Sequence, residues 1–117
     1  MDQDSFHNPN VWGAPCWTFL HCISYTYPIS PRKEDKRHYK QFFKSLQYVL
    51  PCKLCREHYA MYLKKYPIEE GLDSRECLIK YLIHLHNHVN CHYKKSKKLK
   101  IADAKEQLHQ LCQKKVN

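Results

Sequence analysis

The chain has 117 residues, enough for one domain with one hydrophobic core. A hydrophobic content of 43% excludes a disordered tail, and no run reaches the ~20 apolar residues of a membrane span. The net charge is 20 − 11 = +9, and nine tyrosines against two glycines favour helices over a turn-rich β fold.

The N-terminal stretch MDQDSFHNPN carries no visible targeting signal. It is polar and lacks the apolar centre of a secretory signal, and its two aspartates without an arginine are atypical of a mitochondrial matrix peptide. We therefore expect the protein to act in the compartment where it is made, or to reach another by a route not written in this stretch.

Five lysines fall within YKKSKKLK, residues 93–100. Such a run can bind a polyanion, and it can equally be a solvated helix end whose lysines complement the helix dipole. No nucleic-acid recognition module accompanies the run, so a nucleic-acid partner is not expected.

Prolines divide the chain into helical stretches. The first stretch runs from about Ala14 to Tyr27 and stops at Pro28, after which Ser30 and Pro31 are typical of an N-cap and a first helical residue. The second has apolar residues at helical spacing: Tyr39, Phe42, Phe43, Leu46 and Val49.

The next two stretches follow the same pattern. Pro51 ends the second helix, a third begins at Cys52 and closes at Pro67, and Ser74 caps a fourth. The third places these residues on one side: Leu54, Cys55, Tyr59, Tyr62 and Leu63. The fourth is built on Leu78, Tyr81, Leu82, Leu85 and Val89.

A fifth, weaker helix carries Ile101, Leu108 and Leu111. Alternation with a period of two is not sustained anywhere, which argues against strands. We expect residues 1–117 to form a single all-α helical bundle.

Cys52 and Cys55 form a Cys-x-x-Cys pair, which can hold a metal, form a redox disulfide or fill a core. A zinc site with His84 and His88 would leave 28 residues between Cys55 and His84, about twice the usual finger spacing. A thioredoxin-like fold would need βαβ units, which are absent. A helix N-terminus stabilises a thiolate, so the redox interpretation is favoured.

Two further clusters carry polar or aromatic side chains at helical spacing. His86, Asn87 and Asn90 lie near apolar Leu82 and Val89 on the fourth helix, where they satisfy a buried network or line a flat polar ligand.

The other cluster is in the first helix. Trp17 and His21 are four residues apart, and Gly13 just before that helix would allow a close approach of backbone to a ligand. Alone, such a pair is more typical of packing than of cofactor binding.

Taken together and in this order, these motifs resemble the Erv/ALR family of FAD-linked sulfhydryl oxidases. The matching elements are G-x-x-x-W-x-x-x-H from Gly13, F-F-x-x-L-x-x-x-L-P-C-x-x-C from Phe42, and L-x-H-L-H-N-x-V-N from Leu82. The match covers about residues 12–95 with nearly ungapped spacing, and the short chain is similar to compact virus-encoded members.

The resemblance implies a four-helix bundle plus a short fifth helix, with FAD bound at the bundle mouth. It implies that Cys52 exchanges disulfides with the substrate and that Cys55 passes electrons to FAD. The cofactor-binding residues that it implies are Gly13, Trp17, His21, Tyr59, His86, Asn87, Val89, Asn90 and Lys95. No metal site is expected.

The resemblance also implies partners. The substrates would be protein dithiols, a thioredoxin-like protein being one candidate, with O2 as the electron acceptor and H2O2 as the product. A homodimer is expected, because a small bundle with nine tyrosines and four phenylalanines cannot bury them all. The expected location is the host cytoplasm or virion for a virus-encoded member and the mitochondrial intermembrane space for a cellular one.

Two features depart from the family pattern. An N-terminal tail with extra cysteines, which cellular members often carry, is not expected, and the fifth helix has KEQLHQLCQKK where many members have a tryptophan. A disulfide between Cys91 and Cys112 would tie the fifth helix to the end of the fourth. By closing a loop of about 20 residues it would contribute ~3 kcal/mol in the chain-entropy model. The pairing of Cys16, Cys22 and Cys77 stays open.

A function of another class remains as an alternative: a non-catalytic helical module that binds a metal or a polyanion.

Overall fold

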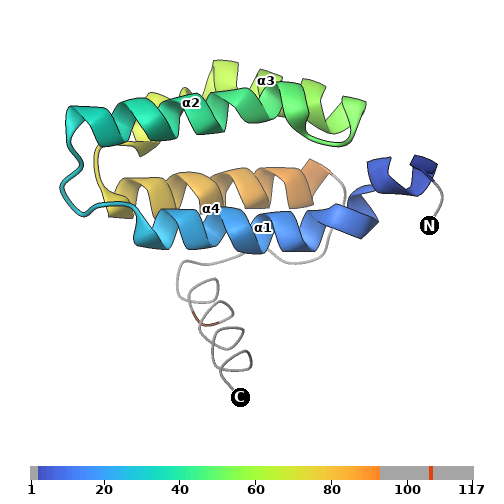
Figure 1. Ribbon diagram of the computed structural model, residues 1–117, viewed down its shortest axis with the longest axis horizontal. Coiled ribbons are helices and arrows are strands. Elements are labelled where there is room, and N and C mark those ends of the chain that lie inside the picture. Colours follow the sequence, from blue (N-terminus) through green and yellow to red (C-terminus); the bar gives the residue numbers. More distant parts are fainter. Residues whose placement is uncertain (1–2, 93–105, 107–117) are drawn as a thin grey trace.

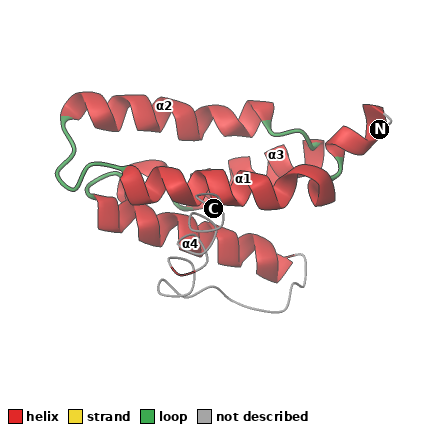
Figure 2. Ribbon diagram, turned by 60° about the horizontal axis from the view of Figure 1, so that its bottom comes forward, coloured by secondary structure: helices red, strands yellow, loops and turns green. Residues whose placement is uncertain are grey.

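The computed structural model describes residues 3–92 and residue 106, and these are helices joined by short loops (Figure 2). The elements are the 3-10 helix η1 (Gln3–His7), α1 (Pro9–Thr26), α2 (Lys33–Val49), α3 (Lys53–Lys65), the 3-10 helix η2 (Ile68–Gly71) and α4 (Arg75–His92). The prediction of an all-α fold is confirmed. The lysine run with Lys95 lies outside the described residues, and so does the predicted fifth helix apart from Glu106, which is helical.

The four long helices form two layers. Figure 1 shows α2 and α3 above α1 and α4, and the closest packing is within each layer, between α1 and α4 and between α2 and α3. Consecutive helices run in opposite directions. One end of the bundle therefore gathers the start of α1, the loop from α2 to α3 and the end of α4. We call it the cysteine end, because Cys52 lies there.

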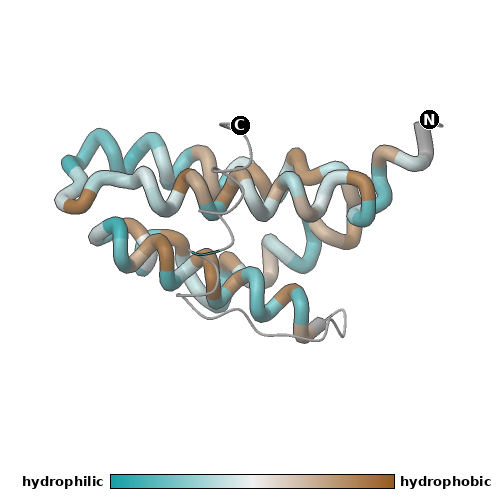
Figure 3. Tube along the Cα trace, turned by 90° about the horizontal axis from the view of Figure 1, so that it is seen from below, coloured by the Kyte–Doolittle hydropathy of each residue, from teal (hydrophilic) through white to brown (hydrophobic). Residues whose placement is uncertain are grey.

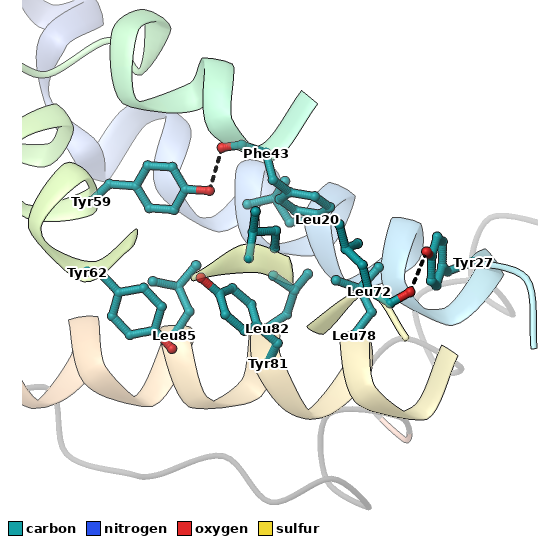
Figure 4. Packing of buried hydrophobic residues seen from close by; sticks show 11 residues of the cluster. Leu20, Tyr27, Phe43, Tyr59, Tyr62, Leu72, Leu78, Tyr81, Leu82 and Leu85 are labelled. Atoms are coloured by element: carbon teal, nitrogen blue, oxygen red, sulfur yellow. Dashed lines mark hydrogen bonds between the residues drawn. The ribbon is translucent and has the colours of Figure 1, made fainter. Parts of the chain in front are cut away.

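The core lies between the layers and is unusually rich in tyrosine (Figure 4). Each buried hydroxyl has a partner: Tyr27 donates to the Leu72 carbonyl and Tyr59 to the Phe43 carbonyl, both at 2.7 Å. The buried residues are Leu20, Tyr27, Phe43, Tyr59, Tyr62, Ile68, Leu72, Leu78, Tyr81, Leu82 and Leu85. Because these phenols are large yet satisfied, they fill the core without an unpaired polar group.

The predicted starts of α3 and α4 are confirmed. Cys52 is the N-cap of α3, and Ser74 caps α4 by accepting a hydrogen bond from the Cys77 N–H at 3.1 Å. Tyr66 ends α3 one residue before Pro67, as the proline predicts.

The starts of α1 and α2 were predicted wrongly. α1 begins at Pro9 rather than near Ala14, because Asn8 accepts from the Asn10 N–H and a proline suits the first helical position. Gly13 consequently lies inside α1 rather than before it. α2 begins at Lys33 instead of Pro31.

Helical spacing grouped Val49 and Leu54 with residues that pack in the bundle, but their own side chains are 63% and 50% exposed. Figure 3 shows hydrophobic and hydrophilic residues alternating along the helices, so each helix has an apolar and a polar side. Val49 and Leu54 flank the turn between α2 and α3. The chain leaves the packed layer at this turn, so side chains at helical spacing no longer face the core there.

Candidate flavin and disulfide site

The Cys-x-x-Cys pair opens α3. Cys52 has extended backbone angles, and its Sγ accepts a hydrogen bond from the backbone N–H of Cys55 at 3.3 Å. Both cysteines are half-buried. One N–H donor of the first helical turn thus faces Cys52 Sγ, an arrangement that suits a sulfur carrying negative charge.

The loop before Cys52 is held from two sides. Arg56 donates from its Nη1 to the Leu50 carbonyl at 2.5 Å, and the His7 ring Nδ1 lies 2.8 Å from the Pro51 carbonyl. Since a carbonyl only accepts, His7 Nδ1 must carry the proton. Sequence analysis missed both residues. Arg56 stands directly after Cys55, but nothing local predicts a contact between His7 and a residue 44 positions away.

Three ring systems meet between α1 and α4. Trp17 stacks on His86 with ring centroids 3.9 Å apart and an angle of 8° between the planes. His21, one turn along α1, lies 5.1 Å from His86 by ring centroids, and its Nε2 is 2.9 Å from His86 Nδ1. The sequence pattern grouped Trp17 with His21, and the fold adds His86 to them from 65 residues away.

His21 is the most buried member of this cluster, with 4% of its surface exposed. Burial, which disfavours the charged imidazolium, lowers the pKa of His21 to about 4. Its Nδ1 is buried and has no hydrogen-bond partner among the described residues. A neutral imidazole with one unsatisfied nitrogen is a position at which the polar edge of a flat ligand would be stabilised.

The other predicted cofactor residues differ in their placement. Asn87, Val89 and Asn90 are half-buried on the last turns of α4, next to His86. Tyr59 is buried in the core and its hydroxyl is bound to the Phe43 carbonyl, so any contact to a cofactor would use its ring.

The position of Gly13 was predicted wrongly, because it lies within α1 and not just before the helix. It is helical, and a Cβ at this position would meet nothing within 4 Å. The open space over Gly13 is compatible with a ligand lying on α1.

The zinc alternative has no geometric support. His84 is exposed, and its Nδ1 is 2.7 Å from the Tyr62 hydroxyl. The described part of the chain contains no group of three or more histidine, cysteine or acidic side chains placed to hold a metal ion. No helix among the described residues is long and apolar enough to cross a membrane.

Two of the remaining cysteines differ in their surroundings. Burial raises the pKa of the half-buried Cys16 thiol, which favours the inert protonated form. Cys91 is exposed near the end of α4, and its predicted disulfide partner Cys112 lies outside the described residues, so that disulfide stays a prediction.

Comparison with known proteins places the chain in a family. The family model described as Erv1 / Alr matches residues 14–110. The chain belongs to the Erv1/Alr family.

Relatives of this Erv1/Alr chain come from a virus and from cellular organisms. A probable FAD-linked sulfhydryl oxidase of Acanthamoeba polyphaga mimivirus is 51% identical over 84 residues, covering 71% of this chain and 59% of the relative. The FAD-linked sulfhydryl oxidase ERV1 of Arabidopsis thaliana is 35% identical over 78 residues, covering 67% and 40%. The chain thus spans about 40% to 60% of the length of these relatives.

Solved structures support the same assignment. The yeast Erv1 core superposes with a TM-score of 0.79 at 26% identity, covering 86% of this chain and 83% of that one. The FAD binding domain of Erv1 from Saccharomyces cerevisiae gives a TM-score of 0.76 at 26% identity, covering 92% and 94%. The four-helix part of the predicted fold is confirmed.

Proposed function

We propose that this Erv1/Alr protein is an FAD-dependent sulfhydryl oxidase that introduces disulfides into protein dithiols. The observation that carries the proposal is the placement of two sites in one bundle. Cys52 and Cys55 lie at the start of α3, at the cysteine end. The Trp17–His86 stack connects the first half of α1 with the second half of α4, and both of these half-helices lie toward the same end (Figure 1).

The residues present fit FAD. The parallel Trp17 and His86 rings are half-buried and offer a flat aromatic surface of the kind on which a purine stacks. The unpartnered Nδ1 of His21 would bind a polar edge of the same ring system. We propose that Asn87, Val89 and Asn90 line the cofactor from α4. Lys95 would lie near its phosphates. Gly13 would leave space for the cofactor over α1, and the Tyr59 ring would contact it from α3.

The two cysteines divide the disulfide exchange. Both cysteines are free thiols in this structure, which therefore corresponds to the reduced form. In the oxidised form, where a disulfide joins them, a substrate thiolate attacks Cys52 Sγ, the bond from Cys52 to Cys55 breaks, and Cys55 leaves as a thiolate. The second substrate thiolate then attacks the substrate sulfur of this mixed disulfide and releases Cys52 as a thiolate. The substrate has lost two electrons and gained a disulfide, and the protein holds both electrons as a dithiol.

FAD, when bound, would accept this electron pair and pass it to O2, so that the overall change is 2 R–SH + O2 → R–S–S–R + H2O2. The chain supplies the geometry. The Cys55 N–H supports charge on Cys52 Sγ, and His7 and Arg56 fix the preceding carbonyls.

The partners belong to the proposal too. A thioredoxin-like dithiol protein is a candidate substrate, and the protein acts as a homodimer. Its relatives include viral proteins and a mitochondrial FAD-linked sulfhydryl oxidase of S. cerevisiae, so the host cytoplasm, the virion and the intermembrane space are the proposed locations.

A visible spectrum and an oxygen electrode test the function together. Purified protein should be yellow, with a flavin band near roughly 450 nm, and should consume oxygen when dithiothreitol is added. Loss of oxygen uptake in both Cys52→Ser and Cys55→Ser, with the yellow colour retained, would support the assigned route. A colourless, zinc-containing protein that consumes no oxygen would instead support the metal-binding module.

A further inference from the structure

Three consecutive backbone carbonyls, those of residues 50–52, each accept a hydrogen bond. Arg56 donates twice, from its Nη1 to the Leu50 carbonyl at 2.5 Å and from its backbone N–H to the Cys52 carbonyl at 2.9 Å. His7 Nδ1 donates to the Pro51 carbonyl between them at 2.8 Å. We call the two side-chain contacts, from Arg56 and His7, the carbonyl clamp.

The segment before Cys52 depends on these contacts because its own backbone offers few others. Pro51 has no N–H to donate. The Leu50 N–H donates to the Leu46 carbonyl at 3.1 Å and ends α2, while α3 begins only after Cys52. Because peptide units are planar, holding two consecutive carbonyls fixes the orientation of both peptide planes. The clamp therefore sets the direction in which the chain enters Cys52.

This direction matters because Cys52 is the N-cap of α3. An N-cap residue needs extended backbone, here φ −130° and ψ 125°, to turn its side chain onto the first helical turn. Cys52 Sγ makes that contact by accepting from the Cys55 N–H at 3.3 Å. A thiol sulfur is a weak acceptor, and the hydrogen bond strengthens when the sulfur is charged. An uncharged disulfide gains less from it, so this geometry favours the reduced pair.

The two parts of the clamp differ in strength. Arg56 is half-buried in α3 and carries a permanent charge, so its hydrogen bond to a carbonyl is charge-assisted. His7 is exposed and comes from η1, where the Trp12 indole N–H donates to the His7 carbonyl at 3.4 Å. We therefore expect Arg56 to contribute more than His7.

We propose that Arg56 and His7 are positioning residues that set the redox equilibrium of the Cys52–Cys55 pair. By holding the carbonyls before Cys52, they keep its sulfur on the N-terminus of α3 and stabilise the dithiol relative to the disulfide. Stabilising the reduced form raises the reduction potential, so the clamp makes the pair a stronger oxidant of substrate thiols. This proposal rests on the proposed oxidase function, in which the pair accepts two electrons from a substrate.

The test equilibrates the full chain, with its FAD, in anaerobic mixtures of reduced and oxidised glutathione. Two glutathione thiols lose two electrons and form one disulfide, while the Cys52–Cys55 disulfide gains them and, with two protons, becomes a dithiol. Acid quenching, alkylation and mass spectrometry of a digest give the reduced fraction of the pair. Arg56→Met should lower the equilibrium constant for reduction about tenfold, a fall of ~30 mV in potential, and His7→Ala should lower it about threefold.

Conservative variants and a matched control separate positioning from general stability. Arg56→Lys keeps a cationic donor and His7→Gln keeps an N–H donor, so each should recover part of the lost equilibrium constant. Arg75 is also half-buried, and its Nε donates to the Tyr27 carbonyl at 2.5 Å, but it begins α4 at the opposite end of the bundle (Figure 1). Arg75→Met should lower the melting temperature without moving the glutathione equilibrium.

The proposal is overturned if Arg56→Met has the equilibrium constant of the unsubstituted protein, if Arg75→Met shifts it equally, or if either clamp variant shifts it toward the dithiol. Should Arg56→Met fail to fold, the His7 variants decide, because η1 lies outside the four-helix bundle (Figure 1). An unchanged equilibrium in His7→Ala would then refute the clamp. The exchange needs no oxygen. A disulfide that forms without any shift in the variants refutes the clamp alone, whereas oxygen uptake with dithiothreitol reports on the oxidase.

Discussion

His21 illustrates how one side chain can have a structural cost and a binding role. It is buried on α1, where its ring forms one hydrogen bond with the His86 ring, and its Nδ1 has no hydrogen-bond partner in the part of the chain that the structure describes. An unsatisfied buried nitrogen costs free energy of folding, of the order of 1–3 kcal/mol. A ligand that donates to or accepts from this atom would recover that cost, which makes the cluster more favourable with cofactor than without.

We predict that the apoprotein loses stability as the pH falls from 6.5 to about 4. The folded state holds His21 neutral with a pKa of about 4, while the unfolded chain binds a proton near the ordinary pKa of 6.5. The unfolded state thus carries more protons in this window, and acid favours it. Urea titrations at several pH values should show the loss.

The control for this prediction separates His21 from general acid effects. His21→Asn should flatten the dependence between pH 6.5 and 4, whereas replacing the exposed His38 by asparagine should leave it in place. An unchanged slope in His21→Asn would show that other groups dominate acid unfolding.

At the scale of an element, the two glycines of the chain have opposite surroundings. Gly71 ends η2, where a Cβ would lie 2.8 Å from Tyr81 Cβ and 2.9 Å from Tyr81 Cγ. These atoms are close to the α4 backbone and cannot swing away. Gly13 lies in α1 with open space around it.

We predict that Gly71→Ala destabilises the fold by about 1–3 kcal/mol through overpacking against Tyr81. Gly13→Ala should instead stabilise the apoprotein by up to about 1 kcal/mol, because alanine is the better helix former. Chemical denaturation measures both. The opposite order would contradict the packing of η2 on α4. Loss of FAD in a stable Gly13→Ala variant would show that the cofactor approaches this backbone.

The elements also show what a sequence can predict here. Prolines and caps act over a few residues, so the starts of α3 and α4 and the end of α3 could be predicted from Cys52, Pro67 and Ser74. The same kind of signal, Asn8 followed by Pro9, marks the start of α1, but it was missed because Gly13 and Pro15 suggested a later start. Helical spacing alone also did not predict that Val49 and Leu54 are exposed, because it does not show where the contact between the two helix layers ends.

The site was predictable as a set of motifs but not as a geometry. Trp17 and His21 share a helix face by spacing alone, whereas the stacking of Trp17 on His86 depends on how α1 packs on α4. The contact between His7 and Pro51 has the same origin. Contacts between residues that are far apart in sequence depend on how the helices pack, so no local sequence pattern predicts them.

For the whole molecule, the predicted reason for dimerisation changes. Among the eight described tyrosines only Tyr48 is exposed, so a large tyrosine surface is not available for an interface. Away from the cysteine end, the exposed aromatic residue is Phe19, at 59%, whose ring lies edge-on to Phe42 with centroids 6.4 Å apart. This pair joins the outer sides of α1 and α2.

We predict a homodimer in solution in which Phe19 is buried. Sedimentation at micromolar concentration should give the mass of two chains, and Phe19→Ser should shift the protein toward monomer because an apolar contact is lost. Met61→Ser, at an exposed position on α3, is the matched control. A single monomer species in the unsubstituted protein would refute the dimer.

The proposed oxidase function depends on electrons passing from Cys52 to Cys55 and on to FAD, and an absorption spectrum of two variants tests this route most directly. In Cys52→Ser, the remaining Cys55 thiolate would lie beside oxidised flavin, and a long-wavelength charge-transfer band should appear. Cys55→Ser should bind FAD equally well, because the ring cluster is untouched, and should lack the band. A band in Cys55→Ser but not in Cys52→Ser would reverse the two roles, and its absence from both flavin-loaded variants would contradict the placement of this disulfide at the cofactor.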